Sequence, residues 1–186
     1  MNGWSLGALV VWFVISAASL WVWFPTRRTG RPPLDRTAVL VAVVIALNLS
    51  TGLVALLAAL GQPTEPPWSW LSVGVGAVAA LLTGGAVTFS VLALADRGAR
   101  PGAPRAQQTV LRGGAWIGAL ERLGMVAVVL TGWPEGVAAI VAVKAFARYP
   151  ELKAGQASGA TERFIIGTFV SLGWAAICAG IVLVLT

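Results

Sequence analysis

The chain has 186 residues, of which 58% are hydrophobic and 11% charged, and its mean hydropathy is +0.84. A soluble domain carries about a quarter charged residues, so this chain lacks the polar surface that would cover a globule in water. A bilayer instead requires apolar runs of about twenty residues. The composition therefore predicts an integral membrane protein.

The net charge of +6, a single cysteine and the lack of histidine limit the functions further. Positive charge can indicate a nucleic-acid partner, but here the basic residues follow membrane topology, so we expect none. Cys178 lies alone in an apolar run, which excludes an intrachain disulfide and a Cys/His metal cluster. The sequence has no H-E-x-x-H, G-x-S-x-G or P-loop motif. We therefore expect no enzyme, no catalytic residue, no cofactor and no metal.

Apolar segments separated by polar loops predict an all-α polytopic membrane helix bundle of about six transmembrane helices. The first three spans are expected at 4–24, 37–60 and 68–95, and together they form an N-terminal half at 1–95. No basic residue precedes the first span, so we expect a retained helix rather than a signal peptide. Asn48 lies near the middle of the second span, where a polar side chain usually bonds to a neighbouring helix. Its alternative role is part of a polar pathway.

A basic linker at 96–112 separates this half from a C-terminal half at 113–186. The C-terminal half begins with two helices that form a hairpin at 112–150, and it ends with a span at 164–185. One face of the last span carries a small residue at every fourth position, which suits close helix packing. These residues are Gly167, Ser171, Ala175 and Ala179.

The distribution of basic residues predicts the orientation. Loops 25–36, 96–112 and 148–163 carry eleven of the thirteen Lys and Arg residues, whereas loops 61–67 and 132–136 carry none. The positive-inside rule then puts both termini outside and the three basic loops in the cytoplasm, as in a multi-pass protein of the bacterial plasma (inner) membrane. Topology accounts for these charges, and contact with anionic lipid headgroups is the lesser alternative.

The hairpin carries ionisable side chains inside apolar sequence, namely Glu121, Arg122, Lys144 and Arg148. A turn at 132–136, centred on residue 134, puts Glu121 opposite residue 147, so that Lys144 and Arg148 bracket it on one helical face. Charges at the bilayer centre cost roughly 2.5–3.5 kcal/mol each on insertion scales, so we expect pairing. Arg122 points about 100° away from Glu121 and is expected to snorkel to the headgroups.

Two further features of the hairpin bear on its packing and depth. Gly114 and Gly118 form a G-x-x-x-G pattern, which would let another helix come close. The charge-free parts, 123–133 and 137–143, have only 11 and 7 residues. If the charges lie at the headgroups, the hairpin is re-entrant, but we favour two thin, tilted spans.

Several motifs of the C-terminal half resemble a known family. They are G-x-W-I-G-x-L-E-R from Gly114, then A-x-K-A, R-Y-P-E-L-K and E-R-F-I-I-G-T-F. This pattern is similar to I-G-x-L-E-R, A-K, R-F-x-E and I-G-T in a family of uncharacterised bacterial integral membrane proteins, and it covers roughly a third of the chain. The matching positions are Ile117, Gly118, Leu120, Glu121, Arg122, Lys144, Arg148, Glu151, Glu162, Ile166, Gly167 and Thr168. Pro150 departs from the pattern. The resemblance implies a candidate site but no activity.

Two classes of function remain open. The favoured one is an accessory or assembly protein whose small-residue helix faces dock onto a second copy, giving a homo-oligomer, or onto a membrane partner protein. The alternative is a small ion or solute carrier or channel that uses Glu121, Lys144 and Asn48. Glu121 is accordingly either a structural ion-pair partner that locks the hairpin or a carboxylate that handles protons or cations.

Overall fold

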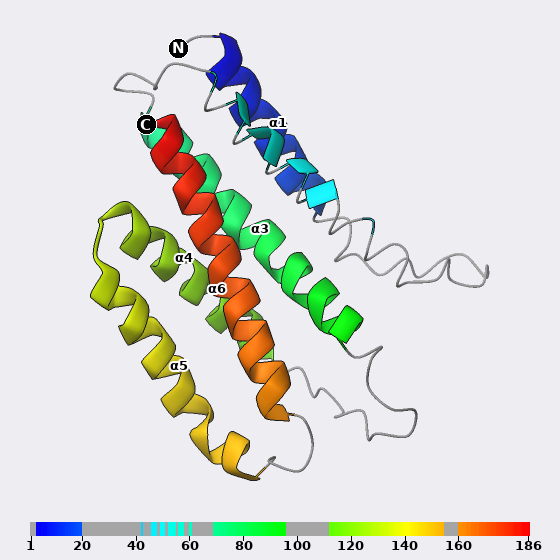
Figure 1. Ribbon diagram of the computed structural model, residues 1–186, viewed down its shortest axis with the longest axis vertical. Helices are drawn as coiled ribbons and strands as arrows, with labels where there is room; N and C mark the ends of the chain where they lie inside the picture. The colour runs from blue at the N-terminus through cyan, green and yellow to red at the C-terminus, as the bar shows by residue number, and fades with distance from the viewer. Residues whose placement is uncertain are drawn as a thin grey trace, which may run out of the picture.

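The computed structural model describes residues 3–19, 69–95, 112–154 and 160–186, together with isolated residues between 42 and 60. All the regular structure in these residues is helical, which confirms the predicted all-α fold. The helices are α1 (Gly3–Ser19), α3 (Ser69–Ala95), α4 (Arg112–Leu130), α5 (Pro134–Ala154) and α6 (Ala160–Leu185). The described residues between 42 and 60 are helical as well. The beginning of α1 and the end of α6 lie at the same end of the bundle (Figure 1).

Two helices of the described part are long and apolar enough to cross a membrane. They are Ser69–Leu92 within α3 and Thr161–Leu185 within α6, close to the spans expected at 68–95 and 164–185. Helices α4 and α5 have 19 and 21 residues, or about 28 and 32 Å at 1.5 Å per residue. The hairpin is thus longer than its charge-free stretches suggested, since both helices continue through their charged positions.

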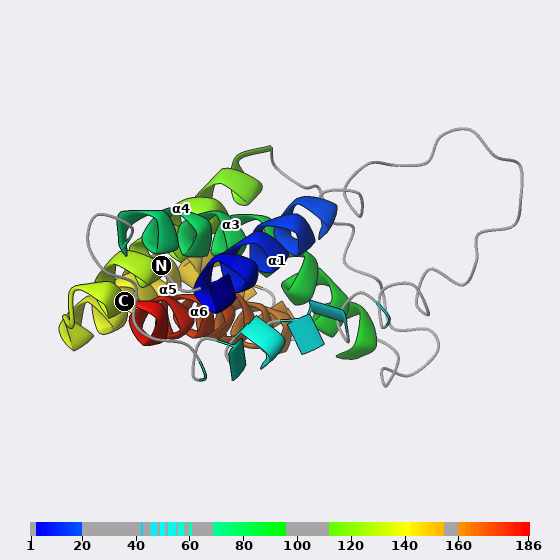
Figure 2. The same cartoon turned by 90° about the horizontal axis from the view of Figure 1, so that it is seen from above.

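The core forms where α3 and α6 pack side by side, with α1 against α3 and α4 against both α3 and α6 (Figures 1 and 2). Small side chains fill this contact, and Ala79, Ala80, Ala175 and Ala179 are fully buried. Gly76 permits the closest approach, because an added Cβ would lie 2.2 Å from Val182 Cγ2. α3 of the predicted N-terminal half therefore packs mainly against the last helix of the C-terminal half.

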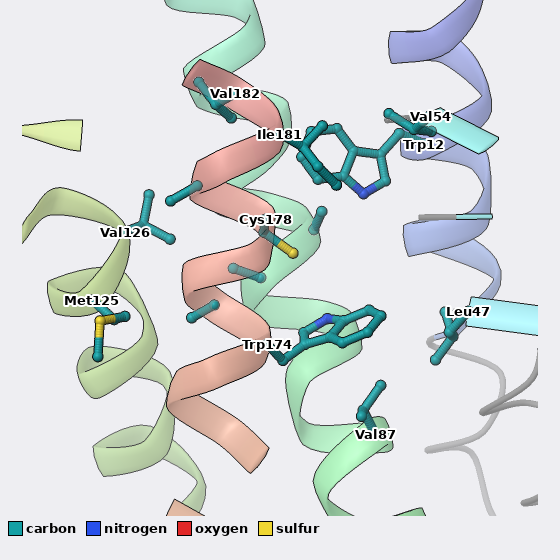
Figure 3. Close-up of a cluster of buried hydrophobic side chains, with 14 of the residues drawn as sticks. Trp12, Leu47, Val54, Val87, Met125, Val126, Trp174, Cys178, Ile181 and Val182 are labelled. Carbon is teal, nitrogen blue, oxygen red and sulfur yellow. The ribbon is translucent and has the colours of Figure 1, made fainter. Parts of the chain in front are cut away.

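Larger side chains surround this contact (Figure 3). Trp12 of α1 lies on one side of α6, and Met125 and Val126 of α4 lie on the other. Cys178 is fully buried between them and is a free thiol, as expected of a small core residue.

Most buried hydroxyls bond to the backbone of their own helix. Thr83 Oγ1 donates to the carbonyl of Ala79 at 2.6 Å, and Ser90 Oγ donates to that of Ala86 at 2.7 Å. Such bonds satisfy a hydroxyl in apolar surroundings without a second helix. Among the other buried hydroxyls of the described residues, Ser171 Oγ accepts a hydrogen bond from Arg122, whereas Ser72 Oγ and Thr168 Oγ1 have no hydrogen-bond partner.

Candidate functional site

The turn between α4 and α5 sets the register of the hairpin. It occupies residues 131–133, where Gly132 has a φ of 65° and Trp133 N donates to the carbonyl of Val128 at 3.1 Å. Pro134 begins α5, a position that suits its fixed φ and missing N–H. The predicted turn at 132–136 is therefore wrong, because Gly136 lies inside α5. An added Cβ there would lie 2.6 Å from Val128 Cγ2, so this glycine lets the two helices approach.

Contacts along the hairpin follow from this shorter turn. Val128 lies beside Gly136, and an added Cβ on Gly124 would lie 3.3 Å from Ile140 Cδ1. The centre of the hairpin is therefore near residue 132 instead of 134. The predicted register is displaced by the same error, so the position opposite Glu121 is Lys144 and not residue 147.

Glu121 and Lys144 form an ion pair, in which Lys144 Nζ donates to Glu121 Oε2. Their side chains are only 12% and 19% exposed, so the pair lies largely inside the protein surface between α4 and α5. Arg148 is exposed one turn further along α5, and its predicted place beside the Glu121 carboxylate stays a prediction. The ion pair therefore links one residue of each helix.

Arg122 lies in the bundle interior with a side chain 9% exposed. Its Nη1 donates to Ser171 Oγ of α6, and its Nη2 donates to the carbonyl of Leu81 of α3, both at 3.3 Å. Its Nε is buried without a hydrogen-bond partner among the described residues. The expectation that Arg122 snorkels to the headgroups is wrong. Arg122 lies on a side of α4 that faces α3 and α6, next to the side that carries Glu121.

Two glycines lie against the Arg122 side chain. An added Cβ on Gly84 would lie 2.5 Å from Arg122 Cδ and 3.1 Å from its Nε, so α3 leaves room for the guanidinium stem at this point. An added Cβ on Gly118 would lie 3.4 Å from Nη1. Gly118 thus lies beside a side chain of its own helix. Gly114 is exposed, and no described atom lies within 4 Å of its would-be Cβ, so docking of a partner at Gly114 stays a prediction.

The small-residue face of α6 is used inside the chain. An added Cβ on Gly167 would lie 3.6 Å from Leu92 Cδ1 and 3.8 Å from Thr88 Cγ2, and Ser171 receives the bond from Arg122. Ala175 and Ala179 continue this face and are fully buried. The close packing expected of this face therefore occurs against α3 and α4.

A hydrogen-bonded pair above Arg122 was not foreseen from the sequence. Trp174 Nε1 of α6 donates to Thr83 Oγ1 of α3 at 2.6 Å, and both groups are buried. The signal available was a buried indole, which needs an acceptor, in a span that faces a threonine-containing helix. The pair ties α3 to α6 one turn from the guanidinium.

The remaining predicted site residue, Asn48, lies outside the described residues. Within the described part of the chain, no three His, Cys, Asp or Glu residues gather in a group that could hold a metal ion. Comparisons with protein-family models, with curated proteins and with solved structures give no match. The resemblance of the C-terminal motifs to a bacterial membrane family therefore stays a prediction.

Proposed function

We propose that this chain is a multi-pass protein of the bacterial plasma membrane that acts as an accessory or assembly protein. Two helices of span length in the described part, α3 and α6, support the membrane location. The other helices would complete about six spans, with the basic loops in the cytoplasm and both termini outside. The start of α1 and the end of α6 lie at the same end of the bundle (Figure 1), as this topology requires.

The observation that carries the proposal is the outward face of α6. Gly173 and Gly180 lie seven residues apart, which puts them on the same side of the helix two turns apart. For both, no atom of the described chain lies within 4 Å of an added Cβ. Glycine costs a helix about 1 kcal/mol relative to alanine. In membranes, small residues at this spacing allow two helix backbones to pack closely.

The occupant we propose for this face is α6 of a second copy of the chain. A two-fold axis would set Gly173 and Gly180 of one copy against the same residues of the other, so one surface supplies both sides of the contact. The contact of α3 with α6 inside the chain uses the same means, small residues on both helices. The result would be a homodimer that presents the hairpin of each copy to other membrane components.

Native mass spectrometry of the gently solubilised protein tests the proposal. We expect a dimer for the wild type and mostly monomer for Gly173→Leu and for Gly180→Leu, because leucine would separate the backbones. The matched control is Gly7→Leu on α1, another outward glycine with nothing within 4 Å, which should stay dimeric. A monomeric wild type, or an equal loss in the control, would overturn the dimer contact. A stoichiometric second protein would replace the second copy as the partner.

A carrier or channel for a small ion or solute is the second candidate, because Glu121 and Lys144 are ionisable groups within the helix hairpin. The structural reading has better support, since the two side chains neutralise each other. Glu121→Gln separates the readings. Transport lost while folding and dimerisation persist would favour the carrier, whereas loss of the fold would favour the structural pair.

A further inference from the structure

Arg122 brings a positive charge into the bundle that no ion pair of the described residues neutralises. The neighbouring Glu121 carboxylate attracts the Arg122 guanidinium electrostatically, but its ion pair is with Lys144 of α5. The two contacts of the Arg122 guanidinium are with a neutral hydroxyl and a backbone carbonyl. Buried charges in proteins are normally paired or bound to an ion, because desolvation of a lone charge is costly. Arg122 therefore has no ion-pair partner of its own among the described residues, and together with Glu121 and Lys144 it leaves one net positive charge in this part of the bundle.

The depth of Arg122 in the bundle raises the free-energy cost of its buried positive charge. Its partner Ser171 lies ten residues after Thr161 and fourteen before Leu185 in the apolar stretch of α6, about 15 and 21 Å along the helix. Its partner Leu81 lies near the middle of the apolar stretch Ser69–Leu92 of α3. Both helices thus hold the guanidinium far from either end of the two membrane-length segments.

Two buried groups near the Ser171 contact have unused hydrogen-bond donors. A guanidinium carries five N–H groups, and both bonds made by Arg122 are long at 3.3 Å, while Nε makes none to the described residues. Thr168 lies one turn before Ser171 on the same face of α6, is 7% exposed, and its Oγ1 also lacks a partner in the described part. Arg122 Nε, which is part of the charged guanidinium, and Thr168 Oγ1 are thus two buried donors left over in the described part of the chain.

We propose that the junction of α3, α4 and α6 at Arg122 binds one small monovalent anion of chloride size. Arg122 Nε and Thr168 Oγ1 donate to it, and Ser171 holds the guanidinium in place. One negative charge balances the single positive charge. The packing of Gly84 and Gly118 against the arginine leaves little room for a larger oxyanion. This site is independent of the proposed dimer face, which lies at Gly173 and Gly180.

The test is isothermal titration of sodium chloride into the purified full chain in detergent, with sodium gluconate holding the ionic strength constant. We expect one saturable chloride per chain and a rise in Tm with chloride that gluconate does not produce. Thr168→Val should fold and bind about tenfold more weakly, as expected for the loss of one hydrogen bond to a charged acceptor. Arg122→Gln should bind no chloride.

Ser72→Ala is the matched control. Ser72 Oγ is another buried hydroxyl without a partner among the described residues, but it lies twelve positions before Gly84 on α3, about 18 Å along the helix. Its loss should leave chloride affinity unchanged. The site is refuted if the wild type shows neither saturable heat nor a chloride-dependent Tm, because water alone then satisfies Arg122 and Thr168. It is equally refuted if Ser72→Ala weakens binding as much as Thr168→Val. Neither result depends on whether the protein dimerises.

Discussion

Glu121 and Arg122 are neighbours in sequence, yet they belong to two different regions of the molecule. Glu121 lies between α4 and α5, where the ammonium of Lys144 neutralises its charge. Arg122 lies between α3, α4 and α6, where its hydrogen bonds in the described part of the chain go only to neutral groups. One helix of 19 residues thus carries an ion-paired charge on one side and, on the next, a charge without an ion pair of its own among the described residues.

The difference separates two reasons for placing a charge inside a bundle. A compensated pair between two helices fixes their register, because any slip would separate the charges in apolar surroundings. A buried cation without an ion-pair partner does not fix the register of two helices in this way. Such a cation is normally found where a protein binds or moves a ligand. The hairpin pair therefore has the character of a structural link, and the three-helix junction that of a binding site.

The largest effect is expected from Lys144→Met, which leaves the Glu121 carboxylate without its counter-charge in a largely buried position. Removing one partner of a buried pair costs about 3 kcal/mol of unfolding free energy. Equilibrium unfolding in mixed detergent micelles would measure this loss. The double variant Glu121→Gln/Lys144→Met should recover most of it.

Lys153→Met, an exposed position in the last turn of α5, serves as the control and should change stability by less than about 0.5 kcal/mol. If Lys144→Met lowers the free energy of unfolding no more than this control does, the ion pair does not lock the hairpin. The two regions would then differ in geometry alone.

Gly84→Ala should have the next largest effect, because its Cβ would fall 2.5 Å from Arg122 Cδ and force the guanidinium stem to move. Overpacking of this kind costs about 2 kcal/mol. The same unfolding measurement applies, with Gly74→Ala on the same helix as control, since no described atom lies within 4 Å of its would-be Cβ. Combining Gly84→Ala with Arg122→Ala should remove most of the added cost. Additive effects of the two changes would contradict a direct clash.

Trp174→Phe should lower stability by about 1 kcal/mol, the contribution of one buried neutral hydrogen bond. The indole N–H donates to Thr83 Oγ1 at 2.6 Å, and Thr83 keeps its own bond to Ala79 when the donor is lost. Unfolding should be followed by far-UV circular dichroism, because removal of one of the nine tryptophans changes the fluorescence signal. A loss above that of Lys144→Met would mean that the junction, and not the hairpin, is the main polar link of the bundle.

Apolar segments separated by polar loops predicted the helices of the described residues and their order, because a helix satisfies its own backbone hydrogen bonds in an apolar medium. The pairing of Glu121 with Lys144 also followed from the cost of lone charges. The sequence did not predict that Arg122 points into the bundle. Both sides of α4 are apolar, so the sequence does not indicate which side of this helix faces α3 and α6. Gly84 of a distant helix decides it, by leaving space for the arginine, and that contact is visible only in three dimensions. The register was displaced because α5 begins at Pro134, the residue assumed to be the centre of the turn, so the true centre lies about two residues earlier.

The smallest effect on the free energy of unfolding is expected from Arg122→Met, and the sign of that effect distinguishes the two regions. Replacing a buried ion by an apolar side chain of similar length is often neutral or stabilising, because the desolvation cost disappears. In chloride-free buffer we expect stability within about 1 kcal/mol of wild type, on the stabilising side. Unfolding of both proteins with and without chloride measures this, and chloride should raise only the wild type. A loss of stability comparable to that of Lys144→Met would instead make Arg122 a structural link like the ion pair beside it, and would remove the distinction between the two sides of α4.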